Sequence, residues 1–390
     1  MLTSLALIFL LGLILGGIFN KLRLPSLLGM MLTGMLLGPY ILDFLDDSIL
    51  NISGDLREFA LVIILTRAGL SLNLEDLKKV GRPAVLMCFV PAVFEIVAVV
   101  IFAPLFLGVT YLEAAIIGTV VAAVSPAVIV PRMIKCMEEG YGTKKSIPQL
   151  ILAGASVDDV FVIVLFTAFT GLAAGEGISV SSFIEVPISI ILGVALGILV
   201  GIILSLLFKK YHFRDSVKVL IILSVSFLLL ALEDLLKGSV PVSGLLAIMT
   251  LGITLNRNYD ILAKRLSVKY NKLWVAAEIL LFVLVGATVD LSYAVNAGIE
   301  VVILVVVALG LRMIGVFVSL LGTTLNSKER MFCMLAYTPK ATVQAAIGSI
   351  PLSMGLECGQ LVLTIAVIAI LITAPFGAIC VDNSYKKLLS

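Results

Sequence analysis

Thirteen long apolar runs, separated by short polar connections, leave this chain of 390 residues few folds to choose from. An α-helix needs about 20 apolar residues to cross a bilayer, whereas a membrane β-barrel is built from short segments of alternating polarity. The runs here are continuous, which excludes the barrel. They predict an all-α integral membrane protein in a single domain over 1–390. About 13 transmembrane helices are expected at 2–20, 26–42, 58–74, 82–107, 112–134, 147–174, 183–208, 216–236, 240–255, 272–290, 297–322, 331–350 and 359–381.

The composition excludes several other classes of protein. Hydrophobic side chains make up 61% of the residues and charged ones only 13%, about half the share found in soluble domains. A net charge of +2 offers no basic surface for a nucleic acid. The five cysteines show no Cys-x-x-Cys spacing, so neither a disulfide framework nor a zinc site is expected. Nothing resembles a phosphate-binding loop or a nucleophile paired with histidine, and we expect neither an enzyme nor a cofactor.

The distribution of Lys and Arg predicts the orientation in the membrane. Of the 27 basic residues, 22 fall in one set of alternate connections and two, Arg57 and Lys237, in the other set. Basic residues concentrate in cytoplasmic loops. We therefore expect a multi-pass protein of a prokaryotic plasma membrane, with its N-terminus outside and its C-terminus in the cytoplasm.

An internal repeat links the two halves of the chain. GLSLNL at 69–74 and GATVDL at 286–291 share a pattern and lie 217 residues apart. Seven predicted spans fill that distance, and because seven is odd the two copies have opposite orientations. This inverted-repeat plan is typical of secondary transporters, in which discontinuous helices meet near the bilayer midplane. We predict a first repeat over about 1–174, a linker helix over about 183–208 and a second repeat over about 216–381.

A proline interrupts one predicted span in each half, in VSPAVIVP at 124–131 and in YTPKATVQAAIG at 337–348. Proline removes a backbone donor and clashes with the preceding turn, so it frees carbonyl groups and exposes helix ends. A simple kink would explain either proline alone. Because both halves carry one, we predict two crossed discontinuous helices.

Five ionisable side chains fall deep within the predicted spans: Glu95, Asp158, Asp159, Arg312 and Lys340. Each is costly in a bilayer unless it is paired or hydrated. Arg312 lies 217 residues after Glu95, so the repeat puts an acid and a base at equivalent positions. We predict that they form an ion pair with a structural or a coupling role. Lys340 is expected to compensate a helix end, to pair with an aspartate, or to reach solvent.

Asp158 and Asp159 lie near the middle of their span and project about 100° apart on a helix. One can therefore face an aqueous cavity while the other turns to a partner in the protein. Burial and a neighbouring carboxylate favour the protonated form, and a hard cation such as Na⁺ binds the same oxygens. A transporter that changes conformation only when a proton or a cation neutralises its carboxylate exchanges the one ion for the other. We predict that Asp158, Asp159, Ser125 and Ser156 bind Na⁺ and H⁺.

Together these segments resemble a known family. The adjacent aspartates, the Ser-Pro step before them, LTGMLLGP and GATVDL are similar to the Asp-Asp branch of the monovalent cation:proton antiporters. The spacing of the five charged residues is most similar to that of the NHA-type sodium/proton exchangers, over essentially the whole chain. The resemblance implies a homodimer and an elevator mechanism, with Asp159 as the principal ion and proton carrier. Many members of that branch carry Lys where this chain has Arg312, which leaves the stoichiometry open.

Other functions remain alternatives at this stage. Exchange or efflux of K⁺ uses similar chemistry, Li⁺ can replace Na⁺, and sodium-coupled symport of an organic anion would keep the same repeat. An intramembrane aspartyl protease needs two aspartates on different helices, which the adjacent pair does not provide. The partners expected are Na⁺ or Li⁺, H⁺, the lipid bilayer and a second copy of the chain.

Overall fold

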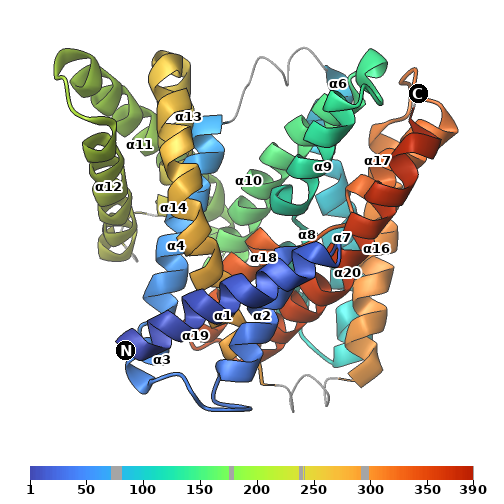
Figure 1. Ribbon diagram of the computed structural model, residues 1–390, viewed down its shortest axis with the longest axis horizontal. Coiled ribbons are helices and arrows are strands. Elements are labelled where there is room, and N and C mark those ends of the chain that lie inside the picture. The colour runs from blue at the N-terminus through green and yellow to red at the C-terminus, as the bar shows by residue number, and fades with distance from the viewer. Residues whose placement is uncertain (72–80, 175–179, 237–239, 241, 291–297, 390) are drawn as a thin grey trace. The chain divides into compact units, whose positions relative to one another are not determined.

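The computed structural model describes residues 1–71, 81–174, 180–236, 240, 242–290 and 298–389, and every regular element in them is helical (Figure 1). In this part of the chain, nine helical segments are long and apolar enough to cross a membrane. They are Leu2–Lys21, Arg82–Leu107, Tyr111–Glu138, Ile147–Ala174, Ile191–Lys210, Asp215–Leu236, Asp260–Ala287, Gly298–Ser319 and Gly359–Leu388. An all-helical membrane protein is therefore confirmed.

The number of thirteen crossings stays a prediction, because four of the expected spans take other forms. The helices α2 (Ser26–Leu37) and α13 (Gly244–Asn258) have 12 and 15 residues, which is short for a complete crossing. The helix α4 (Ser53–Ser71) is long enough but carries several charges. The run predicted at 331–350 is divided into α17 (Ser327–Ala336), α18 (Thr342–Ile347) and the start of α19 (Ile350–Ser353).

The chain forms two compact units, each built from separate stretches of sequence. Unit 1 comprises Met1–Gly54, Asn73–Thr170 and Ile279–Ser390, and unit 2 comprises Asp55–Leu72 and Gly171–Glu278. All five ionisable residues singled out in the sequence belong to unit 1. The predicted repeat boundaries describe equivalent stretches of sequence, which this spatial division does not test, so they also stay a prediction.

Unit 1 holds the helices that surround the charged residues. Besides α2, α17, α18 and α19, these are α1 (Leu2–Lys21), α3 (Asp47–Asn51), α6 (Arg82–Met87), α7 (Val90–Leu107), α8 (Tyr111–Ala122), α9 (Pro126–Glu138), most of α10 (Ile147–Ala174), the end of α14 (Asp260–Ala287), α16 (Gly298–Ser319) and α20 (Gly359–Leu388). The helix α7 packs along both α16 and α8, and α1 packs along α2 (Figure 1). GLSLNL and GATVDL lie partly outside the described residues, so their equivalence is not visible here.

Unit 2 is formed by most of α4, by α11 (Val180–Lys210), α12 (Asp215–Leu236) and α13, and by the first part of α14. Glycines of α11 allow a close approach to α13. A Cβ on Gly193 would lie 2.5 Å from the carbonyl oxygen of Ser243, and one on Gly197 would lie 2.4 Å from that of Ala247. Small residues four apart commonly bring membrane helices together in this way.

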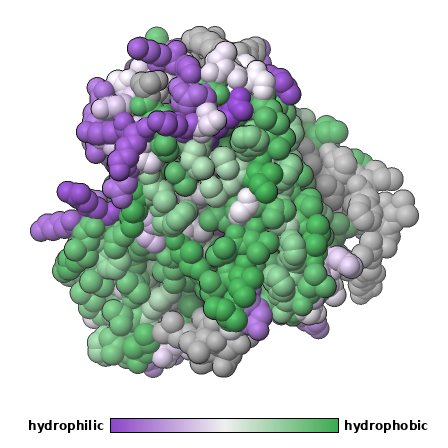
Figure 2. Space-filling model, turned by 90° about the vertical axis from the view of Figure 1, so that its right-hand side faces the viewer, coloured by the Kyte–Doolittle hydropathy of each residue, from purple (hydrophilic) through white to green (hydrophobic). Residues whose placement is uncertain are grey.

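The surface has the polarity of a protein that lies in lipid. Apolar residues cover most of the face drawn in Figure 2, and hydrophilic residues gather at its upper end. In unit 1, the outward side chains include Val97 and Ile101 of α7 and Ile303 and Val306 of α16, all at least 44% exposed. Water would penalise such a continuous apolar surface, whereas the hydrocarbon of a bilayer accepts it.

Candidate ion-binding site

The first interruption in unit 1 separates α8 from α9. A capping box starts α8: the Thr110 hydroxyl accepts from the Glu113 amide at 3.3 Å, and the Glu113 carboxylate accepts from the Thr110 amide at 2.8 Å. The helix ends at Ala122, and α9 starts at Pro126, which suits a first helical position because it has no N–H to leave unpaired. The backbone groups between them are therefore available to other partners.

The second interruption, between α17 and α18, lies directly against the first. The Ser125 amide donates to the carbonyl of Pro339 at 2.8 Å. The Gln344 side chain then joins the two breaks: its amide nitrogen donates to the Ala123 carbonyl at 2.8 Å, and its oxygen accepts from the Ala341 amide at 2.8 Å. One side chain thus satisfies a carbonyl freed at the end of α8 and an amide freed at the start of α18.

The same sequence separation recurs in two contacts at this place. Arg312 contacts Glu95 and the hydroxyl of Thr342 lies 3.5 Å from that of Ser125, and both pairs are 217 residues apart. A comparison of the Ser125-Pro126 and Thr338-Pro339 steps would pair Ser125 with Thr338. The separation of 217 residues instead pairs Ser125 with Thr342, four residues after Thr338. Two buried polar contacts therefore have the same separation as the two short sequence motifs.

Four buried charges form one connected network. Arg312 of α16 donates from Nη1 to Oε2 of Glu95 at 2.9 Å and from Nη2 to Oδ2 of Asp158 at 2.8 Å. Lys340, in the second interruption, donates from Nζ to the same Glu95 oxygen at 2.5 Å. All four side chains are at most 2% exposed. Two acids and two bases balance, which is the condition under which charges are tolerated in a low-dielectric interior.

Backbone groups fix the geometry of this network. Arg312 also donates to the carbonyls of Ala122 and Tyr337, the last residue of α8 and the residue after α17. Asp158 Oδ2 accepts a further hydrogen bond from the Val124 amide at 2.9 Å. The interrupted helices therefore supply donors and acceptors that a continuous helix would use internally. Arg312 is tied at all three of its guanidinium nitrogens.

The two adjacent aspartates of α10 have different surroundings. Asp158 is fully buried and its Oδ2 takes both hydrogen bonds described above, whereas Asp159 is 8% exposed. Among the described residues, no donor reaches Oδ1 of either carboxyl group. A buried carboxylate oxygen without a donor is unstable unless a proton or a cation takes that place. Asp158 already has a basic partner in Arg312, so Asp159 is the one with the chemistry of a group that binds a proton or a cation.

The sequence itself also identifies relatives. A model of the transmembrane region of sodium/hydrogen exchangers matches residues 5–382. The chain belongs to the sodium/hydrogen exchanger family. It is 32% identical to mouse sodium/hydrogen exchanger 9B2 over 382 residues, which are 94% of this chain and 69% of the mouse protein. It is also 32% identical to human sodium/hydrogen exchanger 9B1 over 383 residues, 94% of this chain and 73% of the human one.

The exchanger also resembles a solved structure. The sodium proton antiporter MjNhaP1 from Methanocaldococcus jannaschii matches with a TM-score of 0.85, covering 99% of this chain and 98% of that one at 23% identity. This likeness shows that the two share a fold. The family resemblance read from the motifs is thus confirmed. Family membership makes the chain a multi-pass membrane transporter and not an enzyme.

The structure brings together most of the residues predicted for the site. Glu95 and Arg312 are in direct contact, and Lys340 joins them. Lys340 therefore pairs with Glu95 and not with an aspartate. The base that pairs with Asp158 is Arg312. Ser125 lies at the first interruption, where its amide and hydroxyl meet the second one. The side chain of Ser156 is outside the described residues, so its predicted role stays a prediction.

Several residues of the site were not predicted. Gln344 stood in YTPKATVQAAIG as a polar side chain in an apolar run, and that signal was available. The Val124 amide and the Tyr337 carbonyl gave no signal, because any residue type provides these groups. Thr373 of α20 also escaped notice: its hydroxyl accepts from the Lys340 amide at 2.9 Å.

Proposed function

We propose that this chain is a secondary antiporter that exchanges Na⁺ for H⁺, and that the Asp159 carboxyl group binds the two in alternation. The observation that carries the proposal is the difference between the neighbouring aspartates. Arg312 already neutralises Asp158, whereas Asp159 pairs with no base among the described residues and also has a buried Oδ1 that no described donor reaches. Carboxylate oxygens suit both a proton and a hard cation. The names of its relatives in the sodium/hydrogen exchanger family support the same ions.

Purified protein in liposomes with an internal pH dye tests this function. We expect an added Na⁺ gradient to move protons in the wild type and not in Asp159→Asn, because an amide can neither ionise nor replace a proton by a cation. Asp382→Asn, the same change at a partly exposed carboxylate, is the matched control and should exchange at nearly the wild-type rate. Exchange by Asp159→Asn near the wild-type rate would eliminate the mechanism. Parallel gradients of Li⁺ and K⁺ decide between the cation alternatives.

A binding measurement separates loss of the site from loss of the fold. A ligand that binds only the folded state raises the melting temperature with its concentration. We expect Na⁺ to stabilise the wild type in this way and to leave the melting temperature of Asp159→Asn unchanged. A stabilisation of equal size in both proteins would place the cation elsewhere.

The network supports exchange of one proton for one Na⁺. Arg312 does not lose its proton in a protein, so the Asp158 carboxylate keeps a permanently charged partner. Only Asp159 then changes protonation as the cation binds, and one full cycle moves no net charge. The expected result is exchange whose rate is unaffected by a valinomycin-imposed K⁺ potential. Rates that change steeply with that potential would show that a second proton moves, with Lys340 as the next candidate.

The finer architecture is also part of this proposal. Thirteen crossings require that α2, α4, α13 and the α17–α18 segment traverse the membrane together with the nine longer helical segments. The distribution of Lys and Arg supports an N-terminus outside, the proline in each half supports two crossed interrupted helices, and the resemblance supports a homodimer and an elevator motion. An elevator must carry the ion site as one body, and all charges of the network belong to unit 1. Labelling of single cysteines placed near either terminus, from each side of sealed vesicles, tests the orientation.

A further inference from the structure

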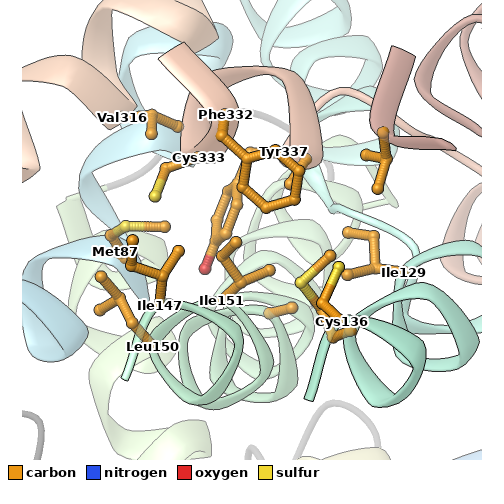
Figure 3. Packing of buried hydrophobic residues seen from close by; sticks show 14 of the residues in the cluster. Met87, Ile129, Cys136, Ile147, Leu150, Ile151, Val316, Phe332, Cys333 and Tyr337 are labelled. Carbon is orange, nitrogen blue, oxygen red and sulfur yellow. The ribbon is translucent and has the colours of Figure 1, made fainter. Parts of the chain in front are cut away.

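The hydroxyl group of Tyr337 has no hydrogen-bond partner among the described residues, although the side chain is completely buried. Figure 3 shows its oxygen, in red, within a cluster of apolar side chains that includes Ile147 and Ile151 of α10. A hydroxyl in such a place has given up its bond to water without replacing it. Phenylalanine would avoid this cost and lose only the oxygen atom, so the place that this oxygen occupies is the feature to explain.

Gly154 of α10 provides the place that this oxygen occupies. A Cβ built on Gly154 would lie 2.0 Å from the Tyr337 hydroxyl oxygen, 3.0 Å from the Met87 Cβ and 3.3 Å from the Tyr337 Cζ. A real Cβ atom essentially never has a neighbour closer than 3.0 Å. Any side chain at position 154 would therefore clash with the hydroxyl oxygen of Tyr337. The oxygen therefore fits into a notch of α10 that only glycine leaves open.

Tyr337 also contacts the ion network from its other side. Its carbonyl accepts from Arg312 Nε at 2.8 Å, and its ring lies 5.5 Å from the centre of the guanidinium group. Asp158 follows Gly154 by four residues, so both project from the same face of α10. Arg312 bonds this aspartate at 2.8 Å. Tyr337 thus contacts both Arg312 and the turn of α10 that precedes Asp158.

We propose that Tyr337 is a positioning residue: its hydroxyl, seated against Gly154, fixes the place of α10 relative to Arg312 and so sets the cation affinity at the Asp158–Asp159 turn. The proposal rests on the exchange function proposed above. A shift of α10 along its axis would lengthen the bond between Arg312 and Asp158. Asp158 would then keep more of its negative charge beside Asp159, and the balance between proton and cation at that carboxyl group would change.

The test is a pair of substitutions that create and then remove the clash, measured in liposomes as the Na⁺ concentration for half-maximal exchange. Gly154→Ala places a methyl group on the hydroxyl oxygen, and we expect that concentration to rise on the order of tenfold. In Gly154→Ala/Tyr337→Phe the clashing oxygen is gone, and the remaining contacts of 3.0 and 3.3 Å need only small adjustments. The double variant should return to within about threefold of the wild type.

Two further variants keep the test decisive if Gly154→Ala folds poorly. Gly171→Ala lies on the same helix with no atom within 4 Å of the new Cβ, and it should behave as the wild type. Tyr337→Phe alone should melt at an equal or higher temperature, because it loses no hydrogen bond, yet its pH profile of exchange should shift. An unchanged profile and half-saturating Na⁺ in Tyr337→Phe, or a double variant no better than Gly154→Ala, would overturn the proposal. Absence of exchange in the wild type would instead refute the proposed function itself.

Discussion

Ion pairs occur in two contrasting settings in unit 1. In the buried network, Glu95, Asp158, Arg312 and Lys340 are at most 2% exposed. Between the middle of α9 and the last turns of α20, Arg132 bonds Asp382 at 3.1 Å with the two side chains 18% and 36% exposed. The groups and the distances are nearly the same in both places. Water makes the difference, because it can replace a lost partner in the partly exposed pair and cannot do so in the network.

The comparison explains why the two sets differ in connectivity. The pair of Arg132 with Asp382 joins one acid to one base, and so does the contact of Lys386 with Glu139 at 3.3 Å. In the network, Arg312 serves two carboxylates and Glu95 serves two bases. Shared partners satisfy more of the donors and acceptors that burial has separated from water. Removing one member must therefore affect the others.

The largest effect is expected from Glu95→Gln. The substitution leaves Arg312 and Lys340 buried together with a single carboxylate, and loss of one partner of such a pair typically costs about 3–5 kcal/mol of unfolding free energy. Combining it with Arg312→Gln restores the balance of charge and should recover part of the loss. Melting curves of the two single variants and the double variant measure the coupling. Purely additive destabilisation would contradict direct pairing.

A smaller effect is expected from Lys340→Met. Glu95 keeps Arg312 as its partner, so the variant loses one charge-assisted hydrogen bond, worth about 1.5–3 kcal/mol. Lys386→Met removes an exposed lysine and serves as the control. A cost for Lys340→Met as large as that of Glu95→Gln, measured in the same melts, would mean that Arg312 alone does not stabilise the buried glutamate.

The exposed pair should contribute still less. Arg132→Gln breaks two hydrogen bonds to Asp382, yet solvent can hydrate the freed carboxylate, so we expect a cost below about 1 kcal/mol. The effect should shrink further in high salt, which screens exposed charges and leaves the network largely unaffected. A salt-independent loss of several kcal/mol would remove the contrast between the two regions.

The smallest expected effect depends on pH at the end of α9. The Tyr385 hydroxyl donates to Glu139 at 2.9 Å and is the main cause that lowers the pKa of this carboxyl group below its usual 4.5. A lowered pKa in the folded state stabilises the protein above the unfolded pKa, and that contribution disappears as the pH falls through the folded pKa. Tyr385→Phe should therefore melt slightly lower than the wild type at pH 6. The difference should shrink as the pH falls below 4.5 and vanish once the pH is below the lowered pKa of the folded state. A difference that grew on acidification would have the wrong sign.

The membrane fold could be predicted largely from the sequence. Long apolar runs identify membrane helices because each must satisfy its own backbone within lipid. The spans with clear ends were the easiest. The run at 331–350 was harder, because its division at Thr338-Pro339-Lys340 depends on contacts with the other interruption. Periodicity alone does not reveal contacts such as the hydrogen bond from Ser125 to Pro339.

One contact of the site was predictable from the repeated motifs in the sequence. A separation of 217 residues led from Glu95 to Arg312, and the structure has them 2.9 Å apart. No such constraint applied to Lys340, whose equivalent in the first half by that separation is the uncharged Ala123. Its choice of Glu95 over an aspartate depends on where the second interruption lies in space. Gly154 gave no signal either, since a glycine in an apolar helix has many explanations.

The sequence by itself determined which chemistry the membrane would enclose: two adjacent aspartates, a distant acid and base, and a lysine beside a proline, in a chain of helices of the exchanger family. Tertiary structure alone decided how these groups share their charges. The backbone of α10 turns Asp158 and Asp159 about 100° apart, and the packing of the two interruptions brings Arg312 and the Val124 amide to Asp158. Because a carboxylate takes its properties from the donors around it, that packing decided that Asp158 is neutralised by Arg312 and that Asp159 has no basic partner among the described residues.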